Sequence, residues 1–227
     1  RRRRVAEEVA EAAPADAETL TKILDWHVHQ HGERTHLVLW HGDGEETSLT
    51  YRQVQSQALK VANVLVRASL QPGERVAIML PTCVEFFAAF FGVLYAGGVP
   101  TPIYPPARPS QIEEHLKRQA SILRNAQAVL LIAEKSTSAV ARLLKLQVES
   151  LRDVVSVDEL RHGPESEILE LAADSTALLQ YTSGSTGDPK GVVLSHSNML
   201  ANIRAMGEAM EAGPTDVFVS WLPLYHD

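Results

Sequence analysis

The sequence is organised around one stretch, Tyr181-Thr-Ser-Gly-Ser-Thr-Gly-Asp-Pro-Lys-Gly191, which lies between two short apolar runs. The run before it covers residues 176–180, and the run after it covers residues 192–195. Short apolar runs bounded by glycine or proline are typical of buried strands. The pattern therefore predicts a strand, a glycine-rich loop and a second strand.

The residue types in this stretch are those that hold phosphate groups. Glycines let the backbone turn tightly and approach a ligand without a Cβ in the way. Hydroxyl groups can donate to phosphate oxygens, and Lys190 adds a positive charge directly after Pro189. The glycines are Gly184, Gly187 and Gly191, and the hydroxyl residues are Thr182, Ser183, Ser185 and Thr186. Together these groups predict a loop that binds an anion.

The spacing differs from that of a P-loop nucleoside triphosphatase. That motif needs a glycine, four residues and then Gly-Lys-Ser/Thr, whereas here Gly184 is followed by Gly187, and Lys190 precedes a glycine. A flexible Gly/Ser linker or an exposed hairpin is the plainer alternative. A linker has no need of a Pro-Lys-Gly ending between two apolar strands, so we favour the phosphate-binding loop.

At these residues the chain resembles the adenylate-forming superfamily, which includes acyl-CoA synthetases, adenylation domains of peptide synthetases, luciferases and fatty acyl-AMP ligases. Its signature loop is rich in Ser, Thr and Gly, ends in Pro-Lys-Gly, and is followed by a strand and a helix that begins with histidine. Here the continuation is Val192-Val-Leu-Ser-His196-Ser-Asn198. The resemblance implies a loop that folds over the β- and γ-phosphates of ATP, with Mg²⁺, while a carboxylate attacks the α-phosphorus.

The resemblance also implies roles for single residues. Thr182 and Thr186 match the hydroxyls closest to nucleotide or metal, and Thr182 is the candidate metal ligand. Lys190 would neutralise the phosphates in catalysis. His226 matches a histidine at the mouth of the acyl pocket; the alternative is a histidine at a strand end that bonds only to backbone. The candidate ATP-binding residues are Thr182, Ser183, Gly184, Ser185, Thr186, Gly187, Lys190 and Gly191.

Three segments favour the fatty acyl-AMP ligases within this superfamily. Gly98-Val-Pro-Thr-Pro-Ile-Tyr-Pro-Pro106 looks like the corresponding segment of that group, in which a Tyr-Pro-Pro ending is usual. Asp188, in Gly-Asp-Pro-Lys, is similar to the loop of the same group, and so is Ser220-Trp-Leu-Pro-Leu-Tyr-His-Asp227. Ordinary acyl-CoA synthetases more often end the first of these segments differently.

The rest of the chain predicts an α/β fold with mostly parallel sheets flanked by helices. A helix over residues 19–30, a hairpin over residues 36–51 and an amphipathic helix over residues 50–68 come first. Strands then alternate with helices, which is the βαβ pattern of a parallel sheet. The expected strands are 75–80, 99–104, 128–133 and 153–157, and the expected helices are 84–96, 110–125 and 136–148. After the loop we expect a helix from Ser195 or Ser197 to about residue 211, and a last strand over residues 216–221.

The resemblance divides the chain into two parts. Residues 1–18 would be a linker or a solvated N-terminal segment, and residues 19–227 the front part of the large AMP-binding domain. The later motifs of the superfamily do not occur here: an acidic Mg²⁺ ligand, an aspartate for the ribose hydroxyls, a hinge and a lysine on a small C-terminal domain. We therefore interpret the chain as an N-terminal fragment and expect it to lack adenylation activity by itself.

Composition limits the partners and the other kinds of site. The formal net charge of −7 gives no basic field for nucleic acid, so a phosphate ligand must be held by local donors. Cys83 is the only cysteine, which excludes an intrachain disulfide. The longest charge-free run is broken at Gly97 and Pro100, and no signal peptide is visible, so we expect no integral membrane segment and a cytoplasmic location. Five early histidines show no metal-ligand spacing, and we reject a metal site there; they are His27, His29, His31, His36 and His41.

The sequence thus favours ATP-dependent activation of a fatty acid to an acyl-adenylate, with release of pyrophosphate. The acyl group would pass to a phosphopantetheine thiol, on a holo acyl carrier protein in preference to CoA. One alternative is a long- or medium-chain acyl-CoA synthetase. Another is a non-catalytic nucleotide-binding or docking module, which would predict damage to the loop, yet Lys190 and its glycines are in place.

Overall fold

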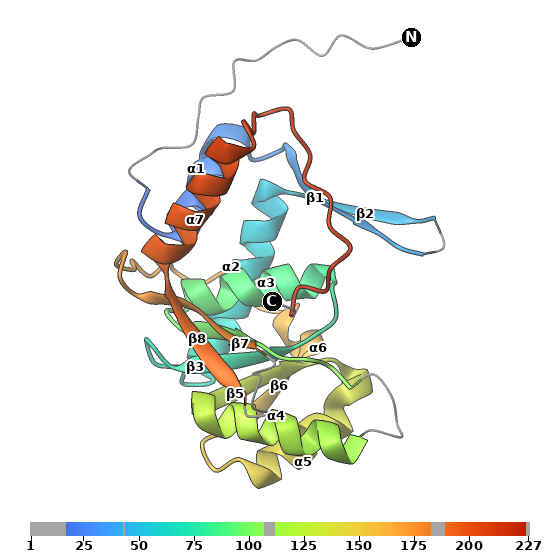
Figure 1. The fold of residues 1–227 in the computed structure, drawn as a ribbon. Helices are drawn as coiled ribbons and strands as arrows, with labels where there is room; N and C mark the ends of the chain where they lie inside the picture. Colours follow the sequence, from blue (N-terminus) through green and yellow to red (C-terminus); the bar gives the residue numbers. More distant parts are fainter. Residues whose placement is uncertain (1–16, 43, 107–111, 183–188, 226–227) are drawn as a thin grey trace.

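The computed structural model describes residues 17–42, 44–106, 112–182 and 189–225. Its first part is a helix, a hairpin and a long helix, as the sequence predicts (Figure 1). The Thr19 side chain accepts a hydrogen bond from the N–H of Lys22, and Thr50 and Gln53 form a capping box. These caps satisfy N–H groups that a helix leaves free at its start. The four elements are α1 (Leu20–His31), β1 (Thr35–Trp40), β2 (Glu46–Thr50) and α2 (Tyr51–Arg67).

The centre of the fold is a parallel sheet of four strands in the order β4-β3-β5-β6, which confirms the predicted α/β class. Its strands are β3 (Arg75–Met79), β4 (Val99–Pro102), β5 (Ala128–Ala133) and β6 (Asp153–Ser156). The helices that connect or follow them are α3 (Val84–Tyr95), α4 (Ile112–Ala126), α5 (Ser138–Gln147) and α6 (Val157–Leu160), with a 3-10 turn at Lys135–Thr137.

Both faces of this sheet are buried, and alternate residues of β3 supply the two cores. Val76 and Ile78 pack in the core that contains α1, α2, α3 and α6. Ala77 and Met79 pack in the core that contains α4 and α5, on the other face. Successive side chains of a strand point to opposite faces, so a strand covered on both sides must be apolar at every position. This explains the unbroken apolar runs that predict β3 and β5.

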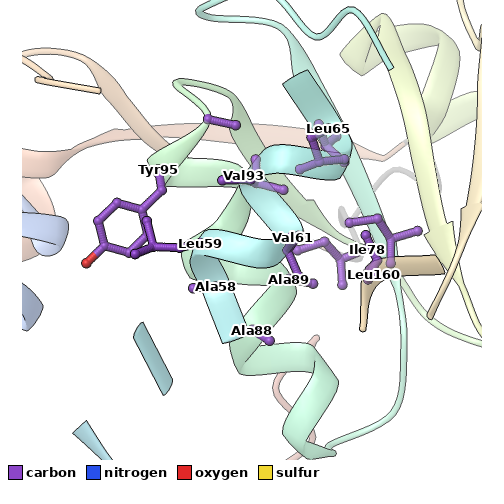
Figure 2. Close-up of a cluster of buried hydrophobic side chains, with 14 of the residues drawn as sticks. Ala58, Leu59, Val61, Leu65, Ile78, Ala88, Ala89, Val93, Tyr95 and Leu160 are labelled. Carbon is purple, nitrogen blue, oxygen red and sulfur yellow. The ribbon is translucent and has the colours of Figure 1, made fainter. Parts of the chain in front are cut away.

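Helices α2 and α3 pack closely together because one position is glycine. A Cβ added to Gly92 would lie 2.5 Å from Cβ of Val61 and 2.8 Å from the carbonyl oxygen of Ala58. Figure 2 shows Ala58 and Val61 of α2 beside Ala88 and Ala89 of α3, the small residues that let the helices approach. The four phenylalanines and Tyr95 on α3 are buried or half-buried, as its nearly all-apolar sequence predicts.

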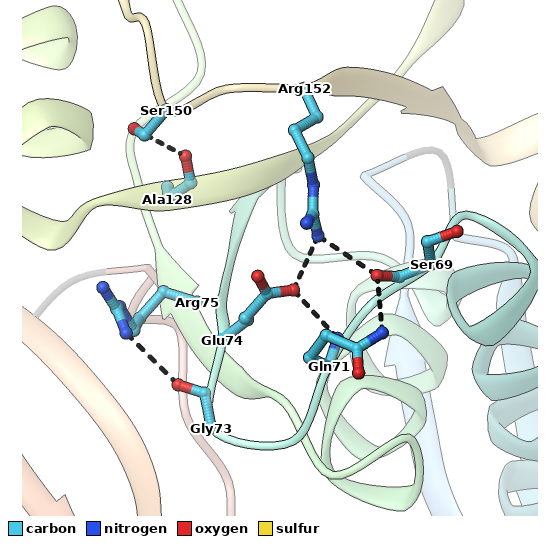
Figure 3. Close-up of polar contacts among 8 residues, drawn as sticks. All are labelled: Ser69, Gln71, Gly73, Glu74, Arg75, Ala128, Ser150 and Arg152. Atoms are coloured by element: carbon cyan, nitrogen blue, oxygen red, sulfur yellow. Dashed lines mark hydrogen bonds and ion pairs between the residues drawn. The ribbon is translucent and has the colours of Figure 1, made fainter.

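A polar network fixes the loop that leads into β3. The guanidinium of Arg152 donates to a carboxylate oxygen of Glu74 at 2.6 Å, and the same oxygen accepts from the N–H of Gln71 (Figure 3). Arg152 also donates to the carbonyl of Ser69. The neighbouring Arg75 donates to the carbonyls of Gly73 and Ala126. These contacts hold the amino-terminal end of β3 in one position.

The glycine-rich stretch joins the two strands of an antiparallel hairpin, β7 (Thr176–Thr182) and β8 (Lys190–Ser195). Strand β8 begins at Lys190, two residues earlier than predicted, because Lys190 pairs with Thr182 and Gly191 with Tyr181. Helix α7 (His196–Ala209) follows directly, and Ser195 caps it as one of the two predicted residues.

His196, at the start of α7, links the hairpin to the first helix of the chain. Its side chain is fully buried, and its Nδ1 accepts a hydrogen bond from the N–H of Leu20 at 3.1 Å. The N–H of His196 donates to the carbonyl of Ser175, just before β7. A residue that opens α7 thus holds together the start of α1, the start of α7 and the base of the hairpin.

The predicted strand over residues 216–221 is wrong. This segment is irregular and pairs with no other described strand. Four of its apolar side chains are 77% to 90% exposed, namely those of Val217, Phe218, Val219 and Trp221. An apolar run forms a strand only when a neighbouring strand accepts its backbone hydrogen bonds, and the described chain offers none here.

Within the described ranges, no helix combines the length and the apolar character that crossing a bilayer requires.

We expect Gly92→Ala to destabilise the chain although alanine favours helix. Overpacking between α2 and α3 costs about 1–3 kcal/mol, which exceeds the gain in helix propensity of about 1 kcal/mol. Gly207→Ala in α7 is the matched control, because nothing lies within 4 Å of its added Cβ, and it should stabilise the chain. Urea unfolding measures the free energy of unfolding of both variants. Equal stabilisation by the two substitutions would contradict the close approach of α2 and α3.

We expect His196→Leu to lower stability and to weaken its dependence on pH. The change leaves the N–H of Leu20 without its acceptor, which costs about 1–3 kcal/mol. Burial holds the pKa of His196 below its usual value of 6.5. Folding therefore favours the neutral form of His196. The stability that this histidine contributes is complete above pH 6.5 and is lost as the pH falls from 6.5 toward the lowered pKa.

The measurement is urea unfolding of the wild-type chain and the variant at about pH 7.5 and about pH 5.5. The loss of unfolding free energy between the two values should be smaller in His196→Leu. His29→Leu, at an exposed position, is the control and should keep the wild-type loss. An unchanged loss in His196→Leu would show that this histidine does not carry the effect.

Candidate functional site

The hairpin places two candidate residues directly opposite each other. Thr182, the last residue of β7, pairs with Lys190, the first residue of β8. Side chains alternate between the faces of a strand, and directly paired residues share a face, so the Thr182 hydroxyl and the Lys190 ammonium lie on one face of the hairpin. Thr182 is half-buried and Lys190 is exposed. The arrangement offers a fixed hydroxyl and an accessible positive charge at the base of the loop.

Gln180 belongs to the same face of β7, two residues before Thr182. Among the described residues, the buried Nε2 of its side chain has no hydrogen-bond partner. A buried amide donor without a partner is costly, and such donors occur where another group completes the site.

The other loop candidates lie outside the described residues. They are Ser183, Gly184, Ser185, Thr186 and Gly187, and their proposed contacts with ATP stay predictions. His226 also lies outside the described residues.

Gly191 is a glycine because a tyrosine ring covers it. A Cβ at this position would lie 3.0 Å from Cζ of Tyr181 and 3.2 Å from Cδ1 of Leu179. Tyr181 is its cross-strand partner. The residue that we predicted for close approach to a ligand therefore also permits close approach of the tyrosine ring.

Tyr181 is a residue that sequence reasoning missed. It is 4% exposed, and its hydroxyl donates to Oδ1 of Asn125 in α4 at 2.5 Å. Burial raises the pKa of Tyr181, although Arg75 opposes this, so the phenol remains a neutral donor. The available signal was an aromatic residue just before the loop with a glycine at the matching position just after it.

A cavity of about 350 Å³ lies between this hairpin and the amino-terminal ends of the parallel strands. Arg75 and Val99, the first residues of β3 and β4, line it together with Tyr181, Gly191 and Asn125. The hairpin thus reaches the sheet at the edge where β3 and β4 begin.

The segment before His226 contacts the opposite edge of the same strands. The N–H of Leu224 donates to Oγ1 of Thr82 at 3.2 Å, and the rings of Tyr225 and Tyr104 meet edge to face at 5.4 Å. Thr82 follows β3 and Tyr104 follows β4. The structure therefore brings Thr182 and Lys190 together, and it places Tyr225, the neighbour of His226, at the carboxyl edge of the sheet.

Two of the early histidines stack on Tyr51, and a third contacts one of them. His27 and His36 stack on Tyr51 with centroid distances of 4.6 and 4.2 Å, and His31 lies 5.8 Å from His27. Burial lowers the pKa values of His27 and His36. Within the described ranges no group of three or more His, Cys, Asp or Glu side chains is placed to hold a metal ion.

Comparison with known proteins gives matches over most of the chain. The family model described as AMP-binding enzyme matches residues 24–227. The long-chain-fatty-acid–AMP ligase FadD32 of Mycolicibacterium smegmatis is 34% identical over 190 residues, which cover 82% of this chain and 29% of that protein. The medium-chain-fatty-acid–[acyl-carrier-protein] ligase JamA of Moorena producens is 31% identical over 218 residues, 92% of this chain and 36% of that protein.

Solved structures agree with the sequence matches. A structure from studies of fatty acyl-adenylate ligases of E. coli and L. pneumophila superimposes with a TM-score of 0.85 at 29% identity. The match covers 93% of this chain and 38% of that chain. The chain thus spans about a third of the length of these relatives.

The family match covers β7, β8 and the whole parallel sheet. The chain belongs to the AMP-binding enzyme family, and its homologues are fatty acyl-AMP ligases.

Proposed function

We propose that the protein containing this chain activates a fatty acid with ATP to form an acyl-adenylate and pyrophosphate. The acyl group then passes to the phosphopantetheine thiol of an acyl carrier protein. The observation that carries the proposal is the cross-strand pair of Thr182 and Lys190 at the base of the Ser/Thr/Gly loop. It supplies a hydroxyl and a cation where a polyphosphate would need them.

The proposed reaction needs positioning and charge neutralisation. A carboxylate oxygen attacks the α-phosphorus, the bond to the β-phosphate oxygen breaks, and pyrophosphate leaves with the bonding electrons. Negative charge grows on the leaving phosphates, and preorganised donors stabilise it. Lys190 is exposed and can turn its ammonium group toward those oxygens, whereas the half-buried Thr182 donates from a fixed place.

Mg²⁺ fits the donor set of the loop. This ion prefers oxygen ligands, retains several waters and is commonly held through substrate phosphates together with few protein groups. The Thr182 hydroxyl would be one such ligand, and the acidic Mg²⁺ ligand of the superfamily does not occur in this chain. Bound there, Mg²⁺ would supply further positive charge to the phosphates.

His226 is proposed to donate from its imidazole near the substrate carboxylate. Its neighbour Tyr225 packs on Tyr104 after β4, and the carboxyl edge of parallel strands is where ligands commonly bind in open α/β sheets. That location supports a substrate-facing role for the segment.

The names of two relatives support fatty acids as substrates and a carrier protein as the acceptor. FadD32 is a long-chain-fatty-acid–AMP ligase, and JamA is a ligase that joins medium-chain fatty acids to an acyl carrier protein. An acyl-CoA synthetase remains the alternative within the class.

We expect the complete protein, given ATP, Mg²⁺ and a fatty-acid mixture, to form acyl-adenylate that mass spectrometry detects. Transfer to a holo carrier protein but not to CoA would support the proposed acceptor. Ready formation of acyl-CoA would identify a synthetase instead. Absence of any adenylate would contradict the proposed activity and favour a non-catalytic module.

We expect Lys190→Ala in the complete protein to slow adenylate formation by about tenfold to a hundredfold, because the leaving phosphates lose a positive charge. Lys117→Ala on α4 is the control, since Lys117 is an exposed lysine whose one ion pair among the described residues is with Glu113. If Lys190→Ala turns over as fast as the wild type, Lys190 does not have the proposed role.

A further inference from the structure

The hairpin meets the rest of the protein mainly through one of its two strands. Strands β7 and β8 form a two-stranded sheet, and such a hairpin is barely stable without packing against another layer. On the β8 side, residues 190–193 are exposed. On the β7 side, Leu179 and Tyr181 enter the core that contains α4. The position of the loop base therefore depends mainly on β7.

Tyr181 makes the polar part of this contact. Of the described side chains in β7 and β8, only that of Tyr181 hydrogen-bonds to α4 or the parallel sheet, through its hydroxyl and Oδ1 of Asn125. The ring lies across Gly191, so the same side chain also touches the start of β8. One tyrosine thus contacts both strands and the helix beside them.

The geometry couples Tyr181 to the candidate site on the opposite face. Thr182 follows Tyr181 in β7, and Lys190 precedes Gly191 in β8. A rotation or shift of the Tyr181–Gly191 pair must therefore move the Thr182–Lys190 pair. We propose that Tyr181, oriented by Asn125, is a positioning residue that sets the placement of Thr182 and Lys190 for the phosphates of the nucleotide; this inference rests on the function proposed above.

The hydroxyl of Tyr181 is not required for packing. Phenylalanine would fill the same space in the core, and Asn125 is an exposed residue that lines the cavity under the hairpin. A hydrogen bond at such a place adds little global stability, because water can replace it when it is lost. Its main effect is to fix the direction in which the ring lies.

The test is Tyr181→Phe in the complete protein, with ATP affinity measured by calorimetry without fatty acid. The Kd for ATP should rise about three- to tenfold, the range that one hydrogen bond covers. The KM for the fatty acid should stay unchanged. Asn125→Ala should produce a similar change, and the double variant should be no weaker than Tyr181→Phe because both act through one bond.

Tyr95→Phe is the matched control. Tyr95 is also buried, and its hydroxyl also donates to a side chain, Asp25, but it lies in the other core beside α1 and α2. This variant should lose stability and keep the wild-type Kd for ATP. An equal rise of the Kd in Tyr95→Phe would overturn the inference, because any loss of a buried hydroxyl would then have the same effect.

Backbone hydrogen exchange without nucleotide provides a second readout. In Tyr181→Phe, exchange should become faster at residues 181–182 and 190–191 and stay unchanged at the other end of the hairpin, near Thr176 and Ser195. Unchanged exchange at the loop end, or an unchanged Kd for ATP, would overturn the inference. If the wild type binds ATP without forming adenylate, the proposed function fails, while a weaker Kd in Tyr181→Phe still supports the positioning role.

Discussion

Burial of the parallel sheet on both faces is the constraint on which the rest of the structure depends. The four residues of β3 that follow Arg75 each contribute to one of two cores, so this part of the strand cannot carry a polar side chain without a partner. Val76 and Ile78 meet the helices of one layer, and Ala77 and Met79 meet those of the other. The sheet is consequently rigid, and functional groups are confined to its edges and to the segments that pack beside it.

The hairpin of β7 and β8 packs against this rigid sheet, but its strands do not pair with those of the sheet. At one end, His196 ties it to α1 through the N–H of Leu20. At the loop end, Tyr181 reaches Asn125. A loop between two fixed strand ends can change its own conformation around a ligand while its base remains in place, which is how loops on rigid scaffolds serve binding sites.

The sequence predicted those parts of the fold whose signal is local. The apolar runs and Gly/Pro joints located the four parallel strands, and the amphipathic pattern over residues 50–68 located α2. The direct pairing of Thr182 with Lys190 was not among these parts, because the apolar runs covered only residues 176–180 and 192–195 and left both residues in the expected loop. The anchoring contacts could not be predicted in the same way, because Tyr181 and Asn125 are 56 residues apart, and His196 and Leu20 are 176 residues apart.

The prediction of a strand over residues 216–221 failed for the same reason. The segment's run of β-branched and aromatic residues has the local propensity of a strand, but propensity does not supply a neighbouring strand. With no ladder partner among the described residues, side chains such as Phe218 and Trp221 remain exposed. By contrast, Leu224 and Tyr225, a few residues further on, find a core to pack against and take defined positions.

The charge of the chain explains why the placement of a few groups matters so much here. A formal net charge of −7 repels a polyphosphate at long range, and screening by salt weakens this repulsion without changing its sign. Binding must then come from donors that act at contact distance, where hydrogen-bond energy falls steeply with poor geometry. Arg75, which lines the cavity beside the hairpin, already donates to two backbone carbonyls and to Gln127. Lys190 therefore carries the local positive charge, and its effect depends on the strand pair that holds it.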